Sequence, residues 1–263
     1  MAAQVLLAVD GGIARVTLNH PGKFNAMSRA MWRDLMGVFE SIQHGADIRC
    51  VVVVGAGGHF CAGGDIAEYP AFRFSEAGLR EFHEQDVWGG LGAMLRCDVP
   101  VVAQIEGNCM GAGVEIASCC DIRVAGASAR FGAPIARLGF PMAPREAQLV
   151  GAALGNLTAR EMLLEAAVLD APTLLLRGFL NAVVADADVA GEALARAQRV
   201  AALAPQAARL NKQTLRALNQ AFPSVERPQD AMDSIVSSAY AYADSAEHRE
   251  GIQAFLDKRK PAF

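Results

Sequence analysis

Two glycine-rich turns carry the residues of this chain that are suited to chemistry. The first spans 55–65 and the second spans 107–113, and each follows a run of apolar residues typical of a buried strand. Backbone N–H groups at such turns, and at the helix start that follows the second, can bind a developing negative charge. Glu115 lies three residues beyond Ala112, about one helical turn in and near the same face. Two N–H donors and a carboxylate together indicate chemistry at a carbonyl group.

Three other interpretations of these turns fit less well. The glycines could serve only tight packing of helix on strand, with Glu115 as a solvated helix residue. A dinucleotide-binding turn would need a third glycine where Phe60 stands, and an acidic residue roughly 20 positions on, much further than Asp65. A hydrolase with Cys61 or Cys109 as nucleophile has no assignable third partner, and buried cysteines are more often small apolar residues.

Composition limits the function classes. A chain of 263 residues can bury a large core. A net charge of −4 gives no electrostatic reason to expect a nucleic acid or an anionic membrane as partner. We find no signal-peptide pattern and no apolar stretch suited to a membrane span. Six cysteines without C-x-x-C spacing fit a reducing cytoplasm and predict no metal site. We therefore expect a cytoplasmic protein.

The hydrophobic pattern predicts the elements that must position the turns. Alternation over 5–9 and 13–18 predicts a hairpin, and Ser28 can cap a helix over 29–43. From about 190 onward the alanine-rich chain is expected to be helical. Further strands are predicted near 50–54, 101–105, 121–125 and 182–184, and further helices near 111–120, 144–153 and 158–166. Such alternation indicates an α/β body with parallel strands.

Four segments match, in order, the sequence elements of one family: 16–26, 60–66, 107–121 and 250–263. The second segment, F-C-A-G-G-D-I, matches F-x-A-G-x-D-[IL]. The third matches N-G-x-x-x-G-G-G-x-E-[LI]-A-x-x-C-D, except that Glu106 stands where asparagine is usual and Ala112 replaces the middle glycine. The fourth matches E-G-x-x-A-F-x-x-K-R-x-P-x-F. The chain therefore resembles the crotonase (enoyl-CoA hydratase/isomerase) superfamily over nearly its whole length.

The resemblance implies a fold, an assembly and a substrate class. It implies an α/β fold in which a spiral of β-β-α units occupies residues 1–190. A helical region over 191–263 would then cover the site and form the contacts of a homotrimer or a dimer of trimers. The implied substrate is an acyl-CoA thioester. Coenzyme A enters as part of that substrate, and no separate cofactor is implied.

The resemblance also assigns roles to individual residues. Family members stabilise an enolate at the thioester oxygen with two backbone N–H groups, which Gly64 and Ala112 match here. An alanine still donates from its main chain. Glu115 matches a catalytic glutamate. The positions assigned to substrate or coenzyme A binding are Lys23, Ala26, Ala62, Asp65, Ile66, Ile135, Phe255 and Lys258.

Several of these residues have a second interpretation. Lys23 either approaches the phosphates or adenine of coenzyme A or is a solvated loop lysine. We expect Asp65 to hold its own turn by capping rather than to act on substrate. Phe255 and Lys258 are expected to close over coenzyme A from a neighbouring subunit, or else to serve helix packing and surface charge.

Catalysis is where the chain departs from the hydratase pattern. Hydratases of the family use a second glutamate directly after an F-G-x-P turn, and that position is Ile135, which cannot transfer protons. The loop that follows brings Arg145 and Glu146 to a wall that is usually neutral. Glu146 could reach inward and replace the missing acid. The interpretation we favour places both residues at a helix start, with Glu146 near the helix dipole and Arg145 in solvent.

We therefore expect a hydratase-like enzyme that adds water to a 2-enoyl-CoA with Glu115. Other reactions of the family stay open, namely isomerisation, decarboxylation and thioester hydrolysis, as does a non-catalytic acyl-CoA-binding role. Isomerases of the family usually rely on the glutamate that Ile135 replaces, so isomerisation fits least well. The polar segment 68–88 is expected to be a mobile lid near the substrate.

Overall fold

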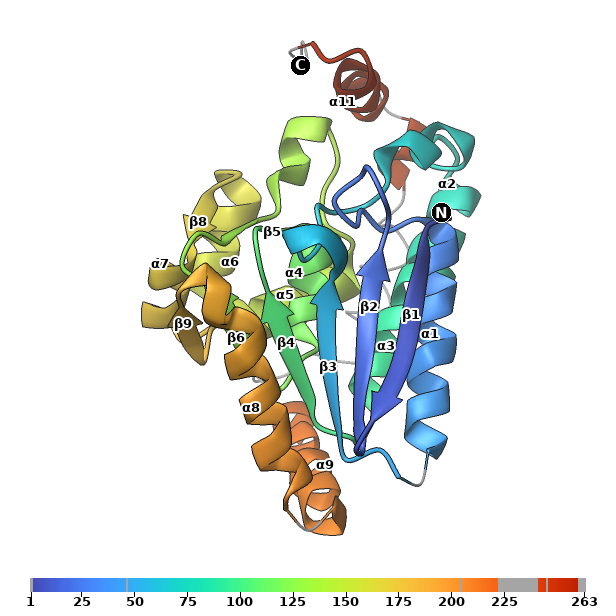
Figure 1. The fold of residues 1–263 in the computed structure, drawn as a ribbon. Coiled ribbons are helices and arrows are strands. Elements are labelled where there is room, and N and C mark those ends of the chain that lie inside the picture. Colours follow the sequence, from blue (N-terminus) through green and yellow to red (C-terminus); the bar gives the residue numbers. More distant parts are fainter. Residues whose placement is uncertain (1, 46, 204, 222–240, 245, 260–263) are drawn as a thin grey trace.

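A six-stranded sheet is the frame of the molecule (Figure 1). This computed structural model describes residues 2–45, 47–203, 205–221, 241–244 and 246–259. The strands are, in spatial order, β1 (Gln4–Asp10), β2 (Ile13–Asn19), β3 (Cys50–Gly55), β4 (Val101–Ile105), β6 (Ile122–Gly126) and β9 (Ala182–Val184). The hairpin β1–β2 is antiparallel and the other neighbours are parallel. Apolar β3 and β4 are buried almost throughout, as expected of central strands covered on both faces.

A second, three-stranded sheet gives the fold its spiral form. It consists of β5 (Asn108–Met110), β7 (Arg130–Gly132) and β8 (Val168–Asp170), with β7 in the middle. The chain passes from β4 in the first sheet to β5 in the second and then into helix α4 (Ala112–Ser118). It likewise passes from β6 to β7. Each successive pair of strands thus contributes one strand to the large sheet and one to the small sheet, which confirms the expected spiral of β-β-α units.

Helices cover both faces of the large sheet. On one face α1 (Arg29–His44) packs with α3 (Trp88–Arg96), and on the other α8 (Val189–Ala201) crosses β3, β4 and β6 (Figure 1). Alternate residues of β3 serve the two faces, because Val51 and Val53 belong to the main core while Val52 packs in a smaller core with Val189. The sheet therefore sits between two helical layers.

The remaining helices surround the carboxyl ends of the parallel strands or extend the molecule away from them. They are α2 (Glu76–Glu81), α5 (Pro144–Leu154), α6 (Asn156–Leu164), α7 (Ala171–Leu176), α9 (Pro205–Ala221) and α11 (Ala246–Leu256). Short 3-10 helices are η1 (Ala56–Gly58), η2 (Ile66–Ala71), η4 (Pro134–Leu138), η5 (Asp186–Asp188) and η6 (Ala241–Asp244), and η3 (Phe82–Val87) is a π-helical turn. No described helix has the length and apolar character needed to cross a membrane.

Most predicted elements are confirmed, with one correction. The hairpin, the parallel strands and the helix capped by Ser28, whose hydroxyl accepts from the N–H of Met31, form as expected. The correction is that the segment 68–88, for which no helix was expected, consists largely of the helical elements η2, α2 and η3; its expected role as a mobile lid stays a prediction. The boundary between 190 and 191 stays a prediction, and residues 260–263 of the C-terminal signature lie outside the described part.

Candidate active site

A cavity of about 480 Å³ lies where the two glycine-rich turns leave the parallel strands. Its wall contains most of the residues that the resemblance assigned to the site: Lys23, Ala26, Ala62, Gly64, Asp65, Ile66, Ala112, Glu115, Ile135 and Phe255. Lys258 is not in this wall, and its expected contact with coenzyme A from a neighbouring subunit stays a prediction. Ligands in open α/β folds commonly bind at the carboxyl ends of strands, which is where this cavity lies.

Backbone hydrogen bonds fasten the two turns to each other. The N–H of Cys61 donates to the carbonyl of Asn108 at 2.9 Å, and the N–H of Met110 donates to the carbonyl of Cys61 at 2.8 Å. The N–H of Phe60 donates to the carbonyl of Glu106 at 2.8 Å. This short parallel pairing fixes the relative position of the turns, and the ring of His59, which accepts from the N–H of Asn108, adds one side-chain contact between them. Consequently Gly64 and Ala112, which follow these contacts, face the same cavity.

The N–H groups of Gly64 and Ala112 have no hydrogen-bond acceptor among the described residues. Ala112 begins α4, so its N–H has no partner within the helix. Gly64 cannot carry a side chain without displacement, because a Cβ there would overlap the hydroxyl of Tyr69. Gly111, which precedes the helix, has a φ of 48°, a conformation that favours glycine. The local backbone conformation therefore directs two N–H groups without acceptors into the same cavity.

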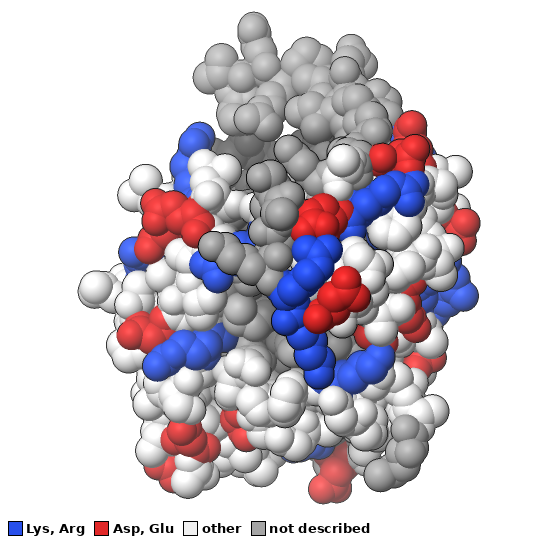
Figure 2. All heavy atoms as spheres, turned by 90° about the horizontal axis from the view of Figure 1, so that it is seen from above, with Lys and Arg blue, Asp and Glu red and all other residues white. Residues whose placement is uncertain are grey.

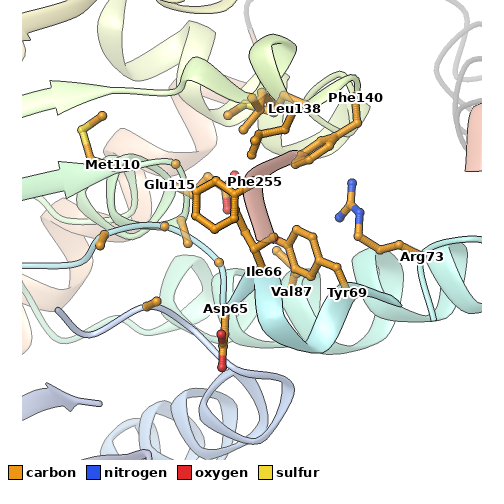
Figure 3. Close-up of a pocket in the computed structure, with 18 of the residues that line it drawn as sticks. Asp65, Ile66, Tyr69, Arg73, Val87, Met110, Glu115, Leu138, Phe140 and Phe255 are labelled. Atoms are coloured by element: carbon orange, nitrogen blue, oxygen red, sulfur yellow. The ribbon is translucent and has the colours of Figure 1, made fainter. Parts of the chain in front are cut away.

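Like Asp65, Glu115 is an acidic residue of the cavity wall. It lies in the first turn of α4 and keeps part of its surface accessible, although protein surrounds it (Figure 3). Burial and, to a lesser degree, the charge of Glu146 raise the pKa of Glu115 to about 8, although the charge of Arg73 opposes the rise. A carboxyl group that titrates near neutral pH is suited to general acid–base catalysis.

Glu146 combines features of the two arrangements considered for it. It is in the first turn of α5, as expected, but only 2% of its surface is exposed, so it points into the protein. Arg145 is partly exposed and forms an ion pair with Glu84 at 2.9 Å. Because Glu146 affects the pKa of Glu115, the two carboxyl groups are neighbours in the folded protein. The expected place of Glu146 at a helix start is therefore confirmed, and its burial also agrees with the alternative in which it reaches inward.

Lys23 and Asp65 form an ion pair at the cavity wall. Nζ of Lys23 lies 2.6 Å from one oxygen of Asp65 and 2.8 Å from the other. Asp65 also caps η2 by accepting from the N–H of Ala67 at 3.3 Å, as expected. In Figure 3 its carboxylate points away from the apolar side chains of the cavity. Asp65 thus holds its turn and also holds Lys23.

Phe255 reaches the cavity from helix α11 of the same chain. It lines the cavity, and its ring lies in front of Glu115 in the view of Figure 3. α11 contacts η2 and η4, which border the cavity. Phe255 thus lines the cavity of its own chain, and the expected closure over coenzyme A of a neighbouring subunit stays a prediction.

A buried polar group at the cavity escaped the sequence analysis. Arg73 is 1% exposed, and its guanidinium lies 4.5 Å from the ring centre of Tyr69 and 4.1 Å from that of Phe140 (Figure 3). Its Nη1 lies 3.3 Å from Nε2 of His83, another residue of the wall, and its Nε donates to Nε2 of His248 at 3.2 Å. Arg73 and His83 come from a segment without clear periodicity, so no sequence signal could have identified them.

The cysteine-nucleophile interpretation is wrong. Cys61 and Cys109 are fully buried. Burial raises the pKa of Cys61 to about 12 and the pKa of Cys109 well above its ordinary value, so neither is a thiolate at neutral pH. Nδ1 of His59 accepts from the N–H of Asn108 at 3.1 Å and is occupied structurally. Within the described ranges, no three His, Cys, Asp or Glu side chains are grouped so as to hold a metal ion.

The surface seen from the α11 end carries both signs of charge. Figure 2 shows basic and acidic side chains next to one another on this face. Ion pairs such as Arg29–Glu81 at 2.8 Å and Arg145–Glu84 at 2.9 Å neutralise charges near the helical segment η3. Among the coloured residues of this face, the two signs of charge are therefore interspersed.

Comparison with known proteins agrees with this geometry. The model of the enoyl-CoA hydratase/isomerase family matches residues 8–263. A probable enoyl-CoA hydratase of Mycobacterium bovis is 29% identical over 260 residues, which cover 98% of this chain and 97% of that protein. The short-chain-enoyl-CoA hydratase of Clostridium acetobutylicum is 30% identical over 258 residues, with 97% and 95% covered. The chain belongs to the enoyl-CoA hydratase/isomerase family, within the crotonase superfamily.

Solved structures show the same fold with more than one activity. An enoyl-CoA hydratase/carnithine racemase from Magnetospirillum magneticum has a TM-score of 0.80 and 35% identity, with 98% of this chain and 94% of that chain covered. A methylmalonyl-CoA decarboxylase in complex with 2-nitronate-propionyl-CoA has a TM-score of 0.86 and 26% identity, with 100% and 99% covered. The fold is thus shared by proteins that carry out different reactions on CoA thioesters.

Proposed function

We propose that this protein is an enzyme that hydrates a 2-enoyl-CoA, with Glu115 as its acid–base group. The observation that carries the proposal is the convergence of the free N–H groups of Gly64 and Ala112 with Glu115 on one cavity. The curated hydratases that match nearly the whole chain support it. Coenzyme A enters as part of the substrate, and we expect turnover to need no added cofactor.

The proposed reaction begins with the thioester oxygen between the N–H groups of Gly64 and Ala112. The carboxylate of Glu115 takes one proton from water while the water oxygen bonds to C3 of the enoyl group. The C2–C3 π electrons shift toward the thioester, and the negative charge develops on its oxygen. Glu115 then returns the proton to C2, so that one water has been added. Removing one comparable donor costs about 3–4 kcal/mol in the barrier.

The apolar wall of the cavity favours this chemistry. Ile66, Tyr69, Phe140 and Ile135 exclude water from the acyl group, and electrostatic interactions strengthen in such surroundings. Ile135 contributes bulk rather than a proton-transfer group. Of the two carboxyl groups in the wall, Asp65 is held by Lys23, so Glu115 must both accept and return the proton.

Hydration of crotonyl-CoA and of a longer enoyl-CoA tests the proposal, through the loss of absorbance of the conjugated thioester. Wild-type protein should turn over at least one of them, and Glu115→Gln should be slower by about 10²-fold or more because it cannot accept a proton. Glu76→Gln, which changes an exposed carboxylate on α2, is the matched control. Saturable binding of enoyl-CoA without turnover by the wild type would refute hydration.

Decarboxylation is the second candidate, favoured by the pKa of Glu115. A group with a pKa raised to about 8 holds its proton at neutral pH. Loss of carbon dioxide from a thioester that carries a carboxylate at C2 leaves an enolate, which needs a proton donor at that carbon. The structural similarity to a methylmalonyl-CoA decarboxylase supports this candidate. Release of carbon dioxide from methylmalonyl-CoA, with no hydration of crotonyl-CoA, would select it.

We also propose that the protein works in the cytoplasm. All six cysteines are free and buried, which fits a reducing compartment. Fractionation of cells that express the untagged chain, followed by immunodetection, tests this. Recovery in a membrane or exported fraction would contradict the proposal.

A further inference from the structure

Glu146 is a buried acidic side chain that the proposed reaction does not use. It is 2% exposed and sits on α5, which packs against α4, the helix of Glu115. A carboxyl group is costly to bury unless hydrogen bonds and charges hold it. We infer that Glu146, held by His83, supplies the second carboxyl group of the site from α5 and acts on the substrate through Glu115. The inference rests on the proposed function, in which Glu115 moves the proton.

His83 fixes one oxygen of Glu146 in place. Its Nδ1 lies 2.9 Å from Oε1 of Glu146, and its Nε2 lies 3.3 Å from Nη1 of Arg73. Because a guanidinium only donates, Nε2 of His83 is the acceptor and Nδ1 carries the hydrogen that it donates to Glu146. Burial and the charge of Arg73 lower the pKa of His83 well below its ordinary value, which agrees with a neutral ring. This hydrogen bond favours the ionised form of Glu146.

The π-helical turn η3 makes this contact possible. η3 places Phe82, His83 and Val87 in the cavity wall, and its preceding helix α2 ends at Glu81. One extra residue per turn rotates the side chains relative to an α-helix, and such turns occur often at functional sites. His83 consequently reaches both the cavity and the buried Glu146.

Charged groups from several elements surround Glu146. Its pKa is raised to about 8, chiefly by burial and also by the charge of Glu84 on η3. A backbone hydrogen bond at the start of α5 opposes the rise, as do the charges of Arg145 on the same helix and of Arg73. The hydrogen bond from His83 acts in the same direction. Four interactions therefore favour the carboxylate form of Glu146.

Fewer interactions stabilise the ionised form of Glu115 than stabilise that of Glu146. Burial and Glu146 both raise its pKa, and Arg73 alone lowers it among the described causes. Of two neighbouring carboxyl groups, the better stabilised loses its proton first, and the other then ionises against a negative charge. Glu146 therefore ionises first and Glu115 last.

This order gives Glu146 a role in the proton steps. An ionised Glu146 increases the proton affinity of Glu115, which makes Glu115 a stronger base toward water. Because the raised pKa of Glu115 still lies near neutral pH, protonated Glu115 can also return the proton to C2. Glu146 is thus a positioning residue in the electrostatic sense, and it compensates from α5 for the carboxyl group that is absent at Ile135.

The test compares the pH dependence of kcat/KM for enoyl-CoA hydration in wild type, Glu146→Gln and Glu146→Asp. In the wild type, kcat/KM should rise with pH through about 8, as Glu115 loses its proton. In Glu146→Gln the rise should move to lower pH by about one unit or more, because Glu115 no longer ionises beside a carboxylate. Glu146→Asp keeps the charge, so kcat/KM should rise at nearly the same pH as in the wild type. Glu76→Gln, on the surface, is the control.

An infrared titration of the carboxyl C=O band, without substrate, provides a readout independent of turnover. The wild type should lose the band of the pair in two steps, and Glu146→Gln should show one step below the upper wild-type step. An unmoved pH profile and an unchanged titration in folded Glu146→Gln would overturn the inference while leaving the proposed function intact. Two steps in a wild type that hydrates nothing would overturn the function alone. If Glu146→Gln does not fold, a single-step titration of the wild type overturns the inference and a two-step titration supports it.

Discussion

At the scale of single residues, the two donors of the cavity differ in how they tolerate a side chain. Ala112 already carries a methyl group, and its N–H still faces the cavity. Gly64 has no such space, because the hydroxyl of Tyr69 occupies the position that a Cβ would take. A backbone donor cannot be deleted by mutation. Its position can be disturbed by steric overlap, however, which makes Gly64 the sensitive one.

We predict that Gly64→Ala lowers kcat of hydration by about 10²–10³-fold, as loss of one oxyanion donor does elsewhere. The added methyl must displace either the turn or Tyr69. Steady-state kinetics with crotonyl-CoA measures the loss, and Gly151→Ala, at a position with open space around its Cβ, is the control. The double variant Gly64→Ala/Tyr69→Phe should recover part of the activity. An active Gly64→Ala single variant would contradict the assignment of Gly64.

The residues of the site were predictable only where a motif names them. Gly64, Ala112 and Glu115 follow glycine-rich turns whose geometry is local, so the pattern of residues indicates them. Glu146 was not predictable in the same way, since its burial depends on a partner more than 60 positions away, His83. Sequence patterns predict well that a residue lies at a helix start, but they do not predict which distant side chain will cover that residue.

At the scale of elements, the π-helical turn η3 is tied to α1 by a buried acidic residue. Asp86 is 4% exposed, and its two oxygens lie 2.5 Å from Nε of Arg29 and 2.7 Å from Nε of Arg33. A buried carboxylate must be paired, so these contacts hold η3 against α1. The position of His83 in the cavity wall depends on the same attachment.

We predict that Asp86→Ala lowers the free energy of unfolding by about 2 kcal/mol, below the usual loss for a fully buried pair because both arginines are partly exposed. Urea unfolding followed by circular dichroism measures the change. Glu76→Ala removes the exposed pair with Arg80 and should cost less than about 0.5 kcal/mol. Equal losses in the two variants would show that η3 does not depend on this attachment.

The helices α4 and α5 together predict a pH dependence of stability. Burial raises the pKa of Glu115 and Glu146 to about 8 from a value of 4.5. Between these values the folded chain keeps protons that the unfolded chain has lost, so stability falls as pH rises through this window. The free energy of unfolding in urea should therefore fall more steeply from pH 5 to 8 in the wild type than in the double variant Glu115→Gln/Glu146→Gln. Parallel slopes would refute this contribution.

The regular elements were predictable because their patterns are local. The periodic apolar residues of α1 and the valine run of β3 each indicate one structure within a few residues. The segment from 66 to 88 lacked such a pattern, because its short helices bury aromatic side chains against distant partners such as Phe140. Only the tertiary contacts determine that these residues are helical.

At the scale of the whole molecule, exposed leucines gather on α6 and α7, on the side away from α1 (Figure 1). Leu157 and Leu164 on α6 are 85% and 75% exposed, and Leu176 on α7 is 89% exposed. Apolar side chains grouped in this way often mark contacts between subunits. The family resemblance, rather than this surface, led us to expect a homotrimer or a dimer of trimers.

We predict that the chain, of 27.7 kDa, has a mass in solution about three or six times that value, measured by light scattering after gel filtration. Leu157→Asp/Leu176→Asp should reduce the mass toward that of the monomer, because charges would be buried at the contact. Leu203→Asp changes another exposed leucine and serves as the control. A monomeric wild type would contradict the expected assembly.

The hydrogen bonds around Cys61 have a consequence for how such enzymes change over evolutionary time. They fasten the two glycine-rich turns mainly through main-chain atoms, so substitutions in the surrounding helices should leave the relative position of the turns intact. An acidic side chain can then be lost from one wall and gained on another in separate steps, with the scaffold unchanged throughout. The variant Ile135→Glu places a carboxyl group at both positions, and the further change Glu146→Gln gives the arrangement that the family resemblance implies. Such a scaffold allows the position of a second carboxyl group to change while the turns stay fixed.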